Sequence, residues 1–155
     1  MEAEEQRVTH VPSTEGKTLW IGRDLLTFKA VGEDTNGAYM LGEAIYSPEG
    51  KGPPPHIHTR EDEAFYVLEG EFEFLDNDRT LIVGAGSFIH IPKGTLHTHK
   101  NVGTKPGRML ILTVPAGLEK FFEEMGTPAT DKSSPRHPPV HQTSKEPSRF
   151  FASTI

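Results

Sequence analysis

The chain has 155 residues and a formal net charge of −6, which results from 22 acidic and 16 basic residues. Because its Lys and Arg residues form no cluster, the charge pattern lacks the basic patch of a nucleic-acid binder and argues against an anionic membrane as a partner. The sequence contains no cysteine, which excludes disulfides, cysteine zinc sites and a cysteine nucleophile. Any bound metal must therefore be held by histidines and carboxylates.

Size and composition favour one domain with many tight turns. A chain of this length can bury a hydrophobic core, and its 15 glycines and 13 prolines exceed average usage. The first ten residues, MEAEEQRVTH, are acidic and contain no apolar segment, and the chain has no run of 18 apolar residues. We therefore expect a cytoplasmic protein that does not enter a membrane.

Strand-like segments follow one another at short spacing along most of the chain. After an N-terminal arm of residues 1–18, such segments occupy residues 19–31, 36–48, 64–75, 79–83, 86–92, 96–102 and 108–114. The first of them can form one strand or two around Gly22, and the third bends at Gly70. About eight to ten strands without helical crossovers predict an all-β sandwich or barrel over residues 19–126.

One segment before residue 127 departs from the strand period of two. The stretch AGLEKFFEEMG after Pro115 has the apolar spacing of one helix face, formed by Leu118, Phe121, Phe122 and Met125. We expect a short C-terminal helix that covers one side of the core. The alternative is a helix whose Phe121 or Phe122 reaches directly into a pocket.

The strand that follows Glu63 bears on the oligomeric state. If Glu63 points inward, Phe65 shares its face, and Tyr66 and Leu68 lie on the outer face, where a monomer would carry polar residues. We predict a homodimer that covers these residues, although the chain's own arm or tail could also cover them. The tail, residues 127–155, is rich in proline and serine, and we expect it to pack on the barrel or on a partner subunit.

The stretch PPPHIHTREDE, residues 53–63, concentrates residues that can bind a metal. In an extended segment residues two apart share a face, so the imidazoles of His56 and His58 point the same way. Glu63 lies five residues further on, an odd offset that needs an intervening bend. The three prolines restrict the backbone that leads into this stretch, so the site is partly preorganised.

A second segment, GSFIHIPKGTLHTHKN at residues 86–101, complements the first. The first segment has the pattern G(X)5HXH(X)4E(X)6G and the second has the pattern G(X)5PXG(X)2H(X)3N. In both patterns the chain resembles the cupin superfamily. Every fixed position of the two motifs is filled, by Gly50, His56, His58, Glu63, Gly70, Gly86, Pro92, Gly94, His97 and Asn101.

The resemblance implies a small single-domain protein with the cupin double-stranded β-helix, a jelly-roll barrel. It also implies that His56, His58, Glu63 and His97 converge on one divalent transition metal inside the barrel. Imidazole nitrogens and a carboxylate suit Fe, Mn, Ni, Co, Cu or Zn better than Ca or Mg, and the residues alone do not choose among the six.

Two stretches, residues 53–74 and GLEKFFEE at 117–124, are similar to small cupins of the quercetin 2,3-dioxygenase type. In that family a divalent metal anchors a flavonol through its deprotonated hydroxyl, the ligand glutamate takes the proton, and dioxygen cleaves the ring with release of carbon monoxide. The resemblance therefore implies a metal-dependent dioxygenase with Glu63 as the general base. Its partners would be a small aromatic or flavonol-like substrate and dioxygen.

Three further residues, Phe65, His99 and Phe122, are expected to line the substrate pocket. His99 lies two positions beyond His97 and should share its inward face. Many similar cupins carry an aromatic or apolar residue at this position. We expect a buried histidine that is bonded to a backbone carbonyl, or alternatively one that supports a metal ligand or contacts the substrate.

Two alternative functions stay open, because fold does not determine function. A metal-dependent isomerase or decarboxylase of a small polar metabolite would use the same metal, but it would need cationic groups inside the barrel, where the predicted inward residues are apolar. A non-catalytic binding or sensor cupin would bind metal and ligand without oxygen uptake.

Overall fold

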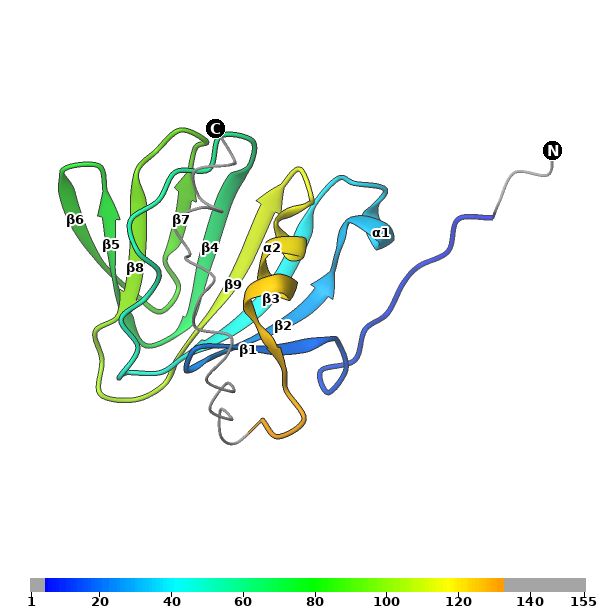
Figure 1. Cartoon of the computed structure of the whole chain (residues 1–155), viewed down its shortest axis with the longest axis horizontal. Helices are drawn as coiled ribbons and strands as arrows, with labels where there is room; N and C mark the ends of the chain where they lie inside the picture. The colour runs from blue at the N-terminus through cyan, green and yellow to red at the C-terminus, as the bar shows by residue number, and fades with distance from the viewer. Residues whose placement is uncertain (1–4, 133–155) are drawn as a thin grey trace.

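The computed structural model describes residues 5–132, and these residues form ten strands and two helices (Figure 1). The elements in chain order are β1 (Thr18–Ile21), β2 (Asp24–Ala30), α1 (Gly32–Thr35), β3 (Met40–Tyr46), β4 (Asp62–Glu69), β5 (Glu71–Asp76), β6 (Arg79–Gly84), β7 (Phe88–Ile91), β8 (His97–Asn101), β9 (Gly107–Val114), α2 (Leu118–Met125) and β10 (Thr127–Pro128). The predicted all-β jelly roll with a short C-terminal helix is confirmed.

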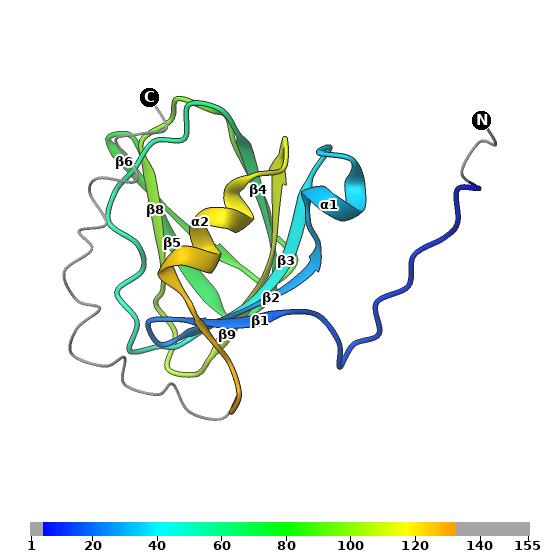
Figure 2. The same ribbon diagram turned by 45° about the vertical axis from the view of Figure 1, so that its right-hand side comes forward.

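Two antiparallel sheets make up the jelly roll. The larger sheet has seven strands in the order β10-β1-β2-β3-β9-β4-β7, and the smaller has three in the order β6-β5-β8. Figures 1 and 2 show the smaller sheet facing the larger one. The core joins the two layers, because Phe72 and Phe74 of β5 belong to the same buried cluster as Phe65 of β4 and Met109 of β9.

The faces of β4 follow the predicted alternation. The side chain of Phe65 is buried, whereas Tyr66 is 43% exposed on the other face. Because β4 pairs with both β7 and β9, Tyr66 lies opposite Phe88 on one side and opposite Leu110 on the other. The outer face of the larger sheet therefore carries a row of apolar residues, Phe88, Tyr66 and Leu110, which we call the outer sheet patch.

The helix α1 was not predicted from the sequence. It has four residues, too few to show a helical period. It ends at Asn36, whose φ of 53° is left-handed, and Gly37 follows with a φ of 79°. These two residues turn the chain, so β3 begins only at Met40, whereas a strand was expected from residue 36.

The helix α2 confirms the predicted amphipathic segment, and Figure 2 shows it lying across the space between the sheets. Its position depends on Glu119, which is buried. Glu119 Oε1 accepts a hydrogen bond from the Gly32 N–H and Oε2 accepts one from the Gly117 N–H, both at 2.7 Å. The side chain thus joins the start of α2 to the start of α1.

The two ends of the described chain differ in whether they pack on the barrel. Residues 5–10 are exposed and run away from the barrel (Figure 1). The start of the tail packs on the barrel, because β10 pairs with β1 and the Trp20 Nε1–H donates to the Asp131 carbonyl at 2.8 Å. The prediction for the rest of the tail, residues 133–155, lies outside the described residues. Within residues 5–132, neither helix is long and apolar enough to cross a membrane.

Candidate metal centre

Backbone pairing brings the two motif segments together. His56 and His97 form an isolated antiparallel bridge, in which the amide N–H of each donates to the carbonyl of the other at 3.0 Å. His97 begins β8, whereas His56 lies in the loop before β4. Gly52 in the same loop has a φ of +70°, and a Cβ at this position would lie 1.8 Å from the His99 carbonyl oxygen. The loop that carries the first motif therefore rests directly on β8.

Local hydrogen bonds orient two of the imidazoles. His56 Nδ1 lies 2.7 Å from the Pro54 carbonyl oxygen, and His97 Nδ1 lies 2.9 Å from the Thr95 carbonyl oxygen. Because a carbonyl oxygen only accepts, each Nδ1 carries a proton and donates it. In the neutral rings Nε2 is then the nitrogen with the lone pair, which is the tautomer that binds a metal through Nε2.

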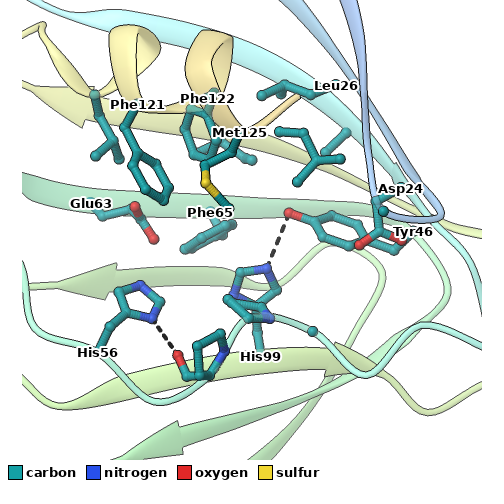
Figure 3. Close-up of a pocket in the computed structure, with 18 of the residues that line it drawn as sticks. Asp24, Leu26, Tyr46, His56, Glu63, Phe65, His99, Phe121, Phe122 and Met125 are labelled. Carbon is teal, nitrogen blue, oxygen red and sulfur yellow. Dashed lines mark hydrogen bonds between the residues drawn. The ribbon is translucent and has the colours of Figure 1, made fainter. Parts of the chain in front are cut away.

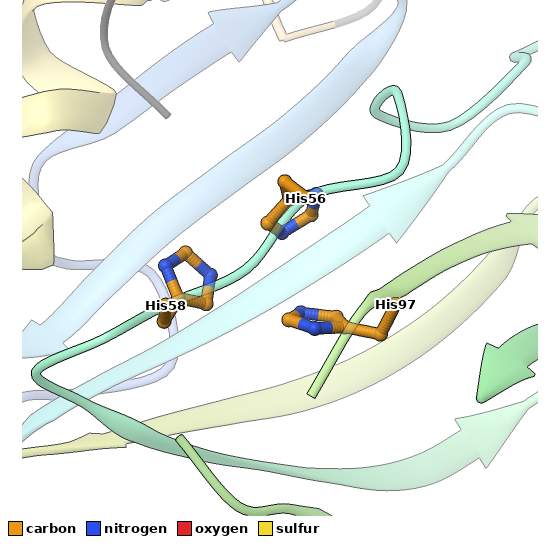
Figure 4. A group of neighbouring side chains, drawn as sticks. All are labelled: His56, His58 and His97. Carbon is orange, nitrogen blue, oxygen red and sulfur yellow. The ribbon is translucent and has the colours of Figure 1, made fainter. Parts of the chain in front are cut away.

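Three histidines form a compact cluster (Figure 4). One ring nitrogen each of His56, His58 and His97 lies within 4.8 Å of the other two, and the ring centroids are 4.3 to 5.3 Å apart. All three side chains are buried. His56 and His58 face one cavity, whereas His97 lies on the wall of a second cavity beside β5, β6 and β7. The structure therefore brings together the three histidines that the resemblance implied.

Glu63, the second residue of β4, contacts two of these histidines. Its Oε2 lies 3.4 Å from His58 Nε2, and its Oε1 lies 3.5 Å from His97 Nε2. Burial by itself would raise the pKa of Glu63, but the close contacts with His58 and His97 and their charge outweigh it and hold the pKa well below its usual range. Glu63 is therefore a carboxylate at neutral pH. The group of nitrogens within 4.8 Å of one another does not include it, so its role as a fourth ligand stays a prediction.

The protonation of the imidazoles follows from burial and from Glu63. Burial lowers the pKa of His56 to about 4, against the opposing effect of the Pro54 carbonyl. Burial also acts to lower the pKa of His97, but the close, negatively charged carboxylate of Glu63 outweighs it and raises that pKa. Metal ligands must be deprotonated, so a cation at His97 Nε2 would take the place of a proton.

The cluster fits a divalent transition metal. Nε2 of His97 is buried and forms no hydrogen bond of normal geometry among residues 5–132, because its neighbour Glu63 Oε1 lies 3.5 Å away. A buried polar atom without a partner destabilises a protein unless a ligand satisfies it. Imidazole nitrogens with an adjacent carboxylate are a donor set for Fe, Mn, Co, Ni, Cu or Zn. Both the types of donor atom and the unsatisfied Nε2 of His97 therefore favour a bound divalent cation.

A mostly apolar cavity of about 280 Å³ opens on the cluster (Figure 3). Phe65, His99 and Phe122, the three predicted pocket residues, all line it; that they contact a substrate stays a prediction. The helix α2 contributes four lining residues, Leu118, Phe121, Phe122 and Met125. Among the described residues, no Lys or Arg lines the cavity, whereas Asp24 and Glu63 do. The cavity therefore suits an apolar molecule better than an anionic one.

Two polar residues of this cavity, Asp24 and Tyr46, were not predicted from the sequence. The Tyr46 hydroxyl and His99 Nε2 form a hydrogen bond of 3.2 Å, so the expected backbone carbonyl partner of His99 was wrong. Burial lowers the pKa of His99 to about 4. Neither Asp24 nor Tyr46 belongs to a motif. The alternation of β3, which directs Tyr46 inward, was the one available signal.

Comparison with known proteins matches residues 42–114 to the family described as Cupin domain. The chain is also similar to quercetin 2,3-dioxygenase of Bacillus subtilis (strain 168), with 28% identity over 116 residues. The match covers 75% of this chain and 34% of that enzyme. The chain thus spans about a third of the length of the dioxygenase.

Two other similar proteins match this chain over most of their own length. Polyketide synthase CurC of Streptomyces cyaneus is 31% identical over 129 residues, which are 82% of this chain and 81% of that protein. The solved structure of the polyketide cyclase RemF from Streptomyces resistomycificus has a TM-score of 0.60 and 26% identity. It covers 70% of this chain and 80% of the cyclase chain.

Proposed function

The chain belongs to the cupin superfamily, and from this premise we propose that it is a metal-dependent dioxygenase of the quercetinase type that acts on a small aromatic or flavonol-like substrate. The observation that carries the proposal is the cluster of His56, His58 and His97 beside the carboxylate of Glu63, of which His56, His58 and Glu63 line an apolar cavity. Similarity to quercetin 2,3-dioxygenase supports it. Dioxygen is the proposed second substrate.

The residues of the cluster have separate roles in this proposal. His56, His58, His97 and Glu63 would hold a divalent metal, which when bound acts as a Lewis acid and acidifies a substrate hydroxyl. Glu63 is ionised at neutral pH and can receive the hydroxyl proton at a carboxylate oxygen. Phe65 and the aromatic residues of α2 provide apolar walls that exclude water from the aromatic substrate.

The composition of the cavity argues against the isomerase and decarboxylase alternatives. Sugar phosphates and small carboxylic acids carry a negative charge that a binding site meets with Arg or Lys. Among the described residues, the cavity has two carboxylates and no such cation. With Glu63 committed to the proposed divalent metal, Asp24 is the remaining carboxylate of the cavity, and it would repel an anionic group that lies away from the metal.

Oxygen consumption with detection of carbon monoxide tests the proposal. The protein is reconstituted separately with Fe, Mn, Co, Ni, Cu and Zn and is offered quercetin and simple catechols. We expect oxygen uptake that depends on one or more of these metals. Stoichiometric metal binding without any oxygen uptake would contradict the dioxygenase and would favour the binding or sensor alternative.

Two matched variants assign the oxygen uptake to the cluster. His97→Ala removes a buried cluster nitrogen, and we expect a loss of metal affinity of about 100-fold or more. His90→Ala removes an exposed imidazole on β7, and we expect metal content and uptake to stay as in the unaltered protein. Equal metal content in both variants would remove His97 from the proposed ligand set.

The variant Glu63→Gln tests the general base separately from the metal. It keeps an oxygen that can contact the histidines but cannot accept the substrate proton as a carboxylate does. We expect kcat to fall by about 100-fold or more in protein whose metal content is verified by elemental analysis. Full turnover at full metal content would show that Glu63 is not the base.

A second candidate function is the cyclisation of an aromatic polyketide. The observation that favours it is the similarity to CurC and RemF over most of their lengths, whereas the match to the dioxygenase covers about a third of that enzyme. An aromatic product would suit the same apolar cavity. Conversion of a linear polyketide substrate without oxygen consumption would replace the dioxygenase by this function.

A further inference from the structure

Asp24 is an acidic residue of the cavity that the proposed function leaves without a role. It begins β2 and lines the cavity with Tyr46. Its Oδ1 accepts a hydrogen bond of 3.0 Å from the Ser47 N–H. Among residues 5–132 it forms no ion pair, and its second carboxylate oxygen accepts no hydrogen bond. Asp24 therefore offers the cavity an acceptor that the fold does not use.

The charge of Asp24 is not needed by the fold. Burial raises the pKa of this carboxyl to about 6, against the opposing effect of the Ser47 hydrogen bond. An asparagine side chain could accept the same bond from Ser47 through its carbonyl oxygen without any charge. A partly buried carboxylate without a cation destabilises the folded state. A ligand that donates a hydrogen bond would give this charge a function.

The neighbours of Asp24 leave it as an acceptor for a ligand. The Tyr46 hydroxyl is already hydrogen-bonded to His99. Burial, followed by the charges of Asp24 and Glu63, raises the pKa of Tyr46 well above its usual value, so this phenol is neutral. In Figure 3, Asp24 and Tyr46 lie on the opposite side of the view from His56 and Glu63, with Phe65 between them. The cavity thus has a carboxylate at each of two ends, with Phe65 and His99 between them.

We infer that Asp24 is a specificity-determining residue, which accepts a hydrogen bond from a hydroxyl at the end of an aromatic substrate remote from the histidine cluster. The inference rests on the proposed function and narrows its substrate class to aromatic molecules with hydroxyl groups at both ends. Substrates that carry a hydrogen, a methyl ether or a carboxylate at the remote position bind more weakly. They either fail to donate the hydrogen bond or repel the carboxylate.

A binding experiment with three flavones tests this inference without relying on turnover. The protein is loaded with zinc, which has no redox chemistry, and is titrated under argon with 3-hydroxyflavone, 3,4′-dihydroxyflavone and 3,7-dihydroxyflavone. Each dihydroxyflavone adds one remote hydroxyl to the same parent. We expect at least one of them to bind about tenfold more tightly than the parent, as a hydrogen bond to a charged acceptor allows.

The variant Asp24→Asn should remove this preference selectively. We expect the affinity for 3-hydroxyflavone to stay within about twofold and the tenfold gain from the remote hydroxyl to fall to about twofold or less, because a neutral amide oxygen is a weaker acceptor. Glu73→Gln is the matched control, because Glu73 lies on β5 and pairs with Lys100 instead of lining the cavity. This control should keep the full preference.

The possible failures are distinguishable. If unaltered protein binds a flavone but shows the same preference as Asp24→Asn, or no preference, the role of Asp24 is overturned and the proposed function stands. If Asp24→Asn weakens all three flavones equally, Asp24 supports the shape of the cavity and does not select the remote hydroxyl. If none of the flavones binds to the unaltered protein, this inference and the flavonol-like substrate of the proposed function are overturned, and oxygen uptake with simple catechols decides whether the dioxygenase itself stands.

Discussion

His56 and His97 use the same local arrangement, in which Nδ1 donates to the carbonyl two residues earlier in the chain. The acceptors, Pro54 and Thr95, belong to the same short segments as the histidines. A short stretch of sequence therefore determines the orientation of each ring. The convergence of His97 with His56 and His58 was predicted from the resemblance of the two motifs to the cupin superfamily, because only the long-range bridge between His56 and His97 brings the two segments together.

Gly52→Ala tests how strongly the first motif depends on its contact with β8. The new Cβ would overlap the His99 carbonyl oxygen. The alanine would also have to adopt the left-handed φ that Gly52 has. We expect the free energy of unfolding to fall by about 3 kcal/mol or more, with weaker zinc binding because the loop that carries His56 is displaced. Urea denaturation and a competition titration with a chelator measure the two effects.

Gly37→Ala is the matched control for this variant. Gly37 also has a positive φ, of +79°, but a Cβ there would meet no atom within 4 Å. We expect a loss of about 1 kcal/mol from backbone strain alone and no change in zinc affinity. Equal losses in the two variants would mean that the contact between Gly52 and β8 has no special importance.

Asp24→Asn should change the pH dependence of stability. The pKa of Asp24 is about 6 in the folded state, above its ordinary value of 3.8, so between these pH values the folded state binds more protons than the unfolded state. The unaltered protein therefore loses stability as the pH rises through this range. We expect the free energy of unfolding of Asp24→Asn to equal that of the unaltered protein near pH 4. Above pH 7 it should be about 2 kcal/mol larger, after allowance for partial solvent screening.

Thermal denaturation of the two proteins from pH 4 to pH 8 measures this effect. Only the difference between the proteins is informative, because the cluster histidines titrate equally in both. A difference that is constant with pH would show that Asp24 has an ordinary pKa in the folded protein.

At the level of elements, α2 illustrates how much a local pattern determines. The period of its apolar residues predicts a helix with one buried face, and the structure confirms that this face lines the cavity. The anchor of the helix was not predictable. In the sequence Glu119 looks like one more acidic residue of the polar face. Only folding brings the Gly32 N–H to 2.7 Å from its carboxylate.

Glu119→Ala tests this anchor. It removes two short hydrogen bonds and leaves the N–H groups of Gly32 and Gly117 without that acceptor. We expect the free energy of unfolding to fall by about 2–4 kcal/mol. Glu123→Ala on the same helix is the control, because Glu123 is 41% exposed and makes a 3.4 Å ion pair with Lys17.

Glu123→Ala should lower the free energy of unfolding by about 0.5 kcal/mol or less, because an exposed ion pair contributes little to stability. Urea denaturation of both variants gives the comparison. Equal stabilities would show that the carboxylate of Glu119 does not hold α2 in place.

At the level of the whole molecule, the outer sheet patch bears on the predicted homodimer. Phe88 is 66% exposed and lies opposite Tyr66, which is 43% exposed. A flat row of exposed apolar side chains on paired strands is typical of a surface that another protein surface covers. We propose that a second copy of the chain packs on this patch.

Tyr66→Glu should dissociate such a dimer. We expect the unaltered protein to have twice the chain mass of 17.2 kDa by light scattering and Tyr66→Glu to have the single mass, because the new charge would be buried in the interface. Ile82→Glu is the matched control, since Ile82 is 57% exposed on β6 of the other sheet. A single mass for the unaltered protein would contradict the homodimer.

The sequence by itself determined the strand alternation, the period of α2 and the positions of the candidate metal ligands. The alternation and the helical period depend on residues within a few positions of one another, whereas the ligand positions follow from the resemblance of two separate motifs to a known family. The tertiary structure decided the rest of the cavity, because its members are distant in the chain. Asp24 meets Ser47, and Tyr46 meets His99, only after β2, β3 and β8 have been assembled into the two sheets. No local spacing records such a contact, since the packing of whole strands determines which side chains share a cavity.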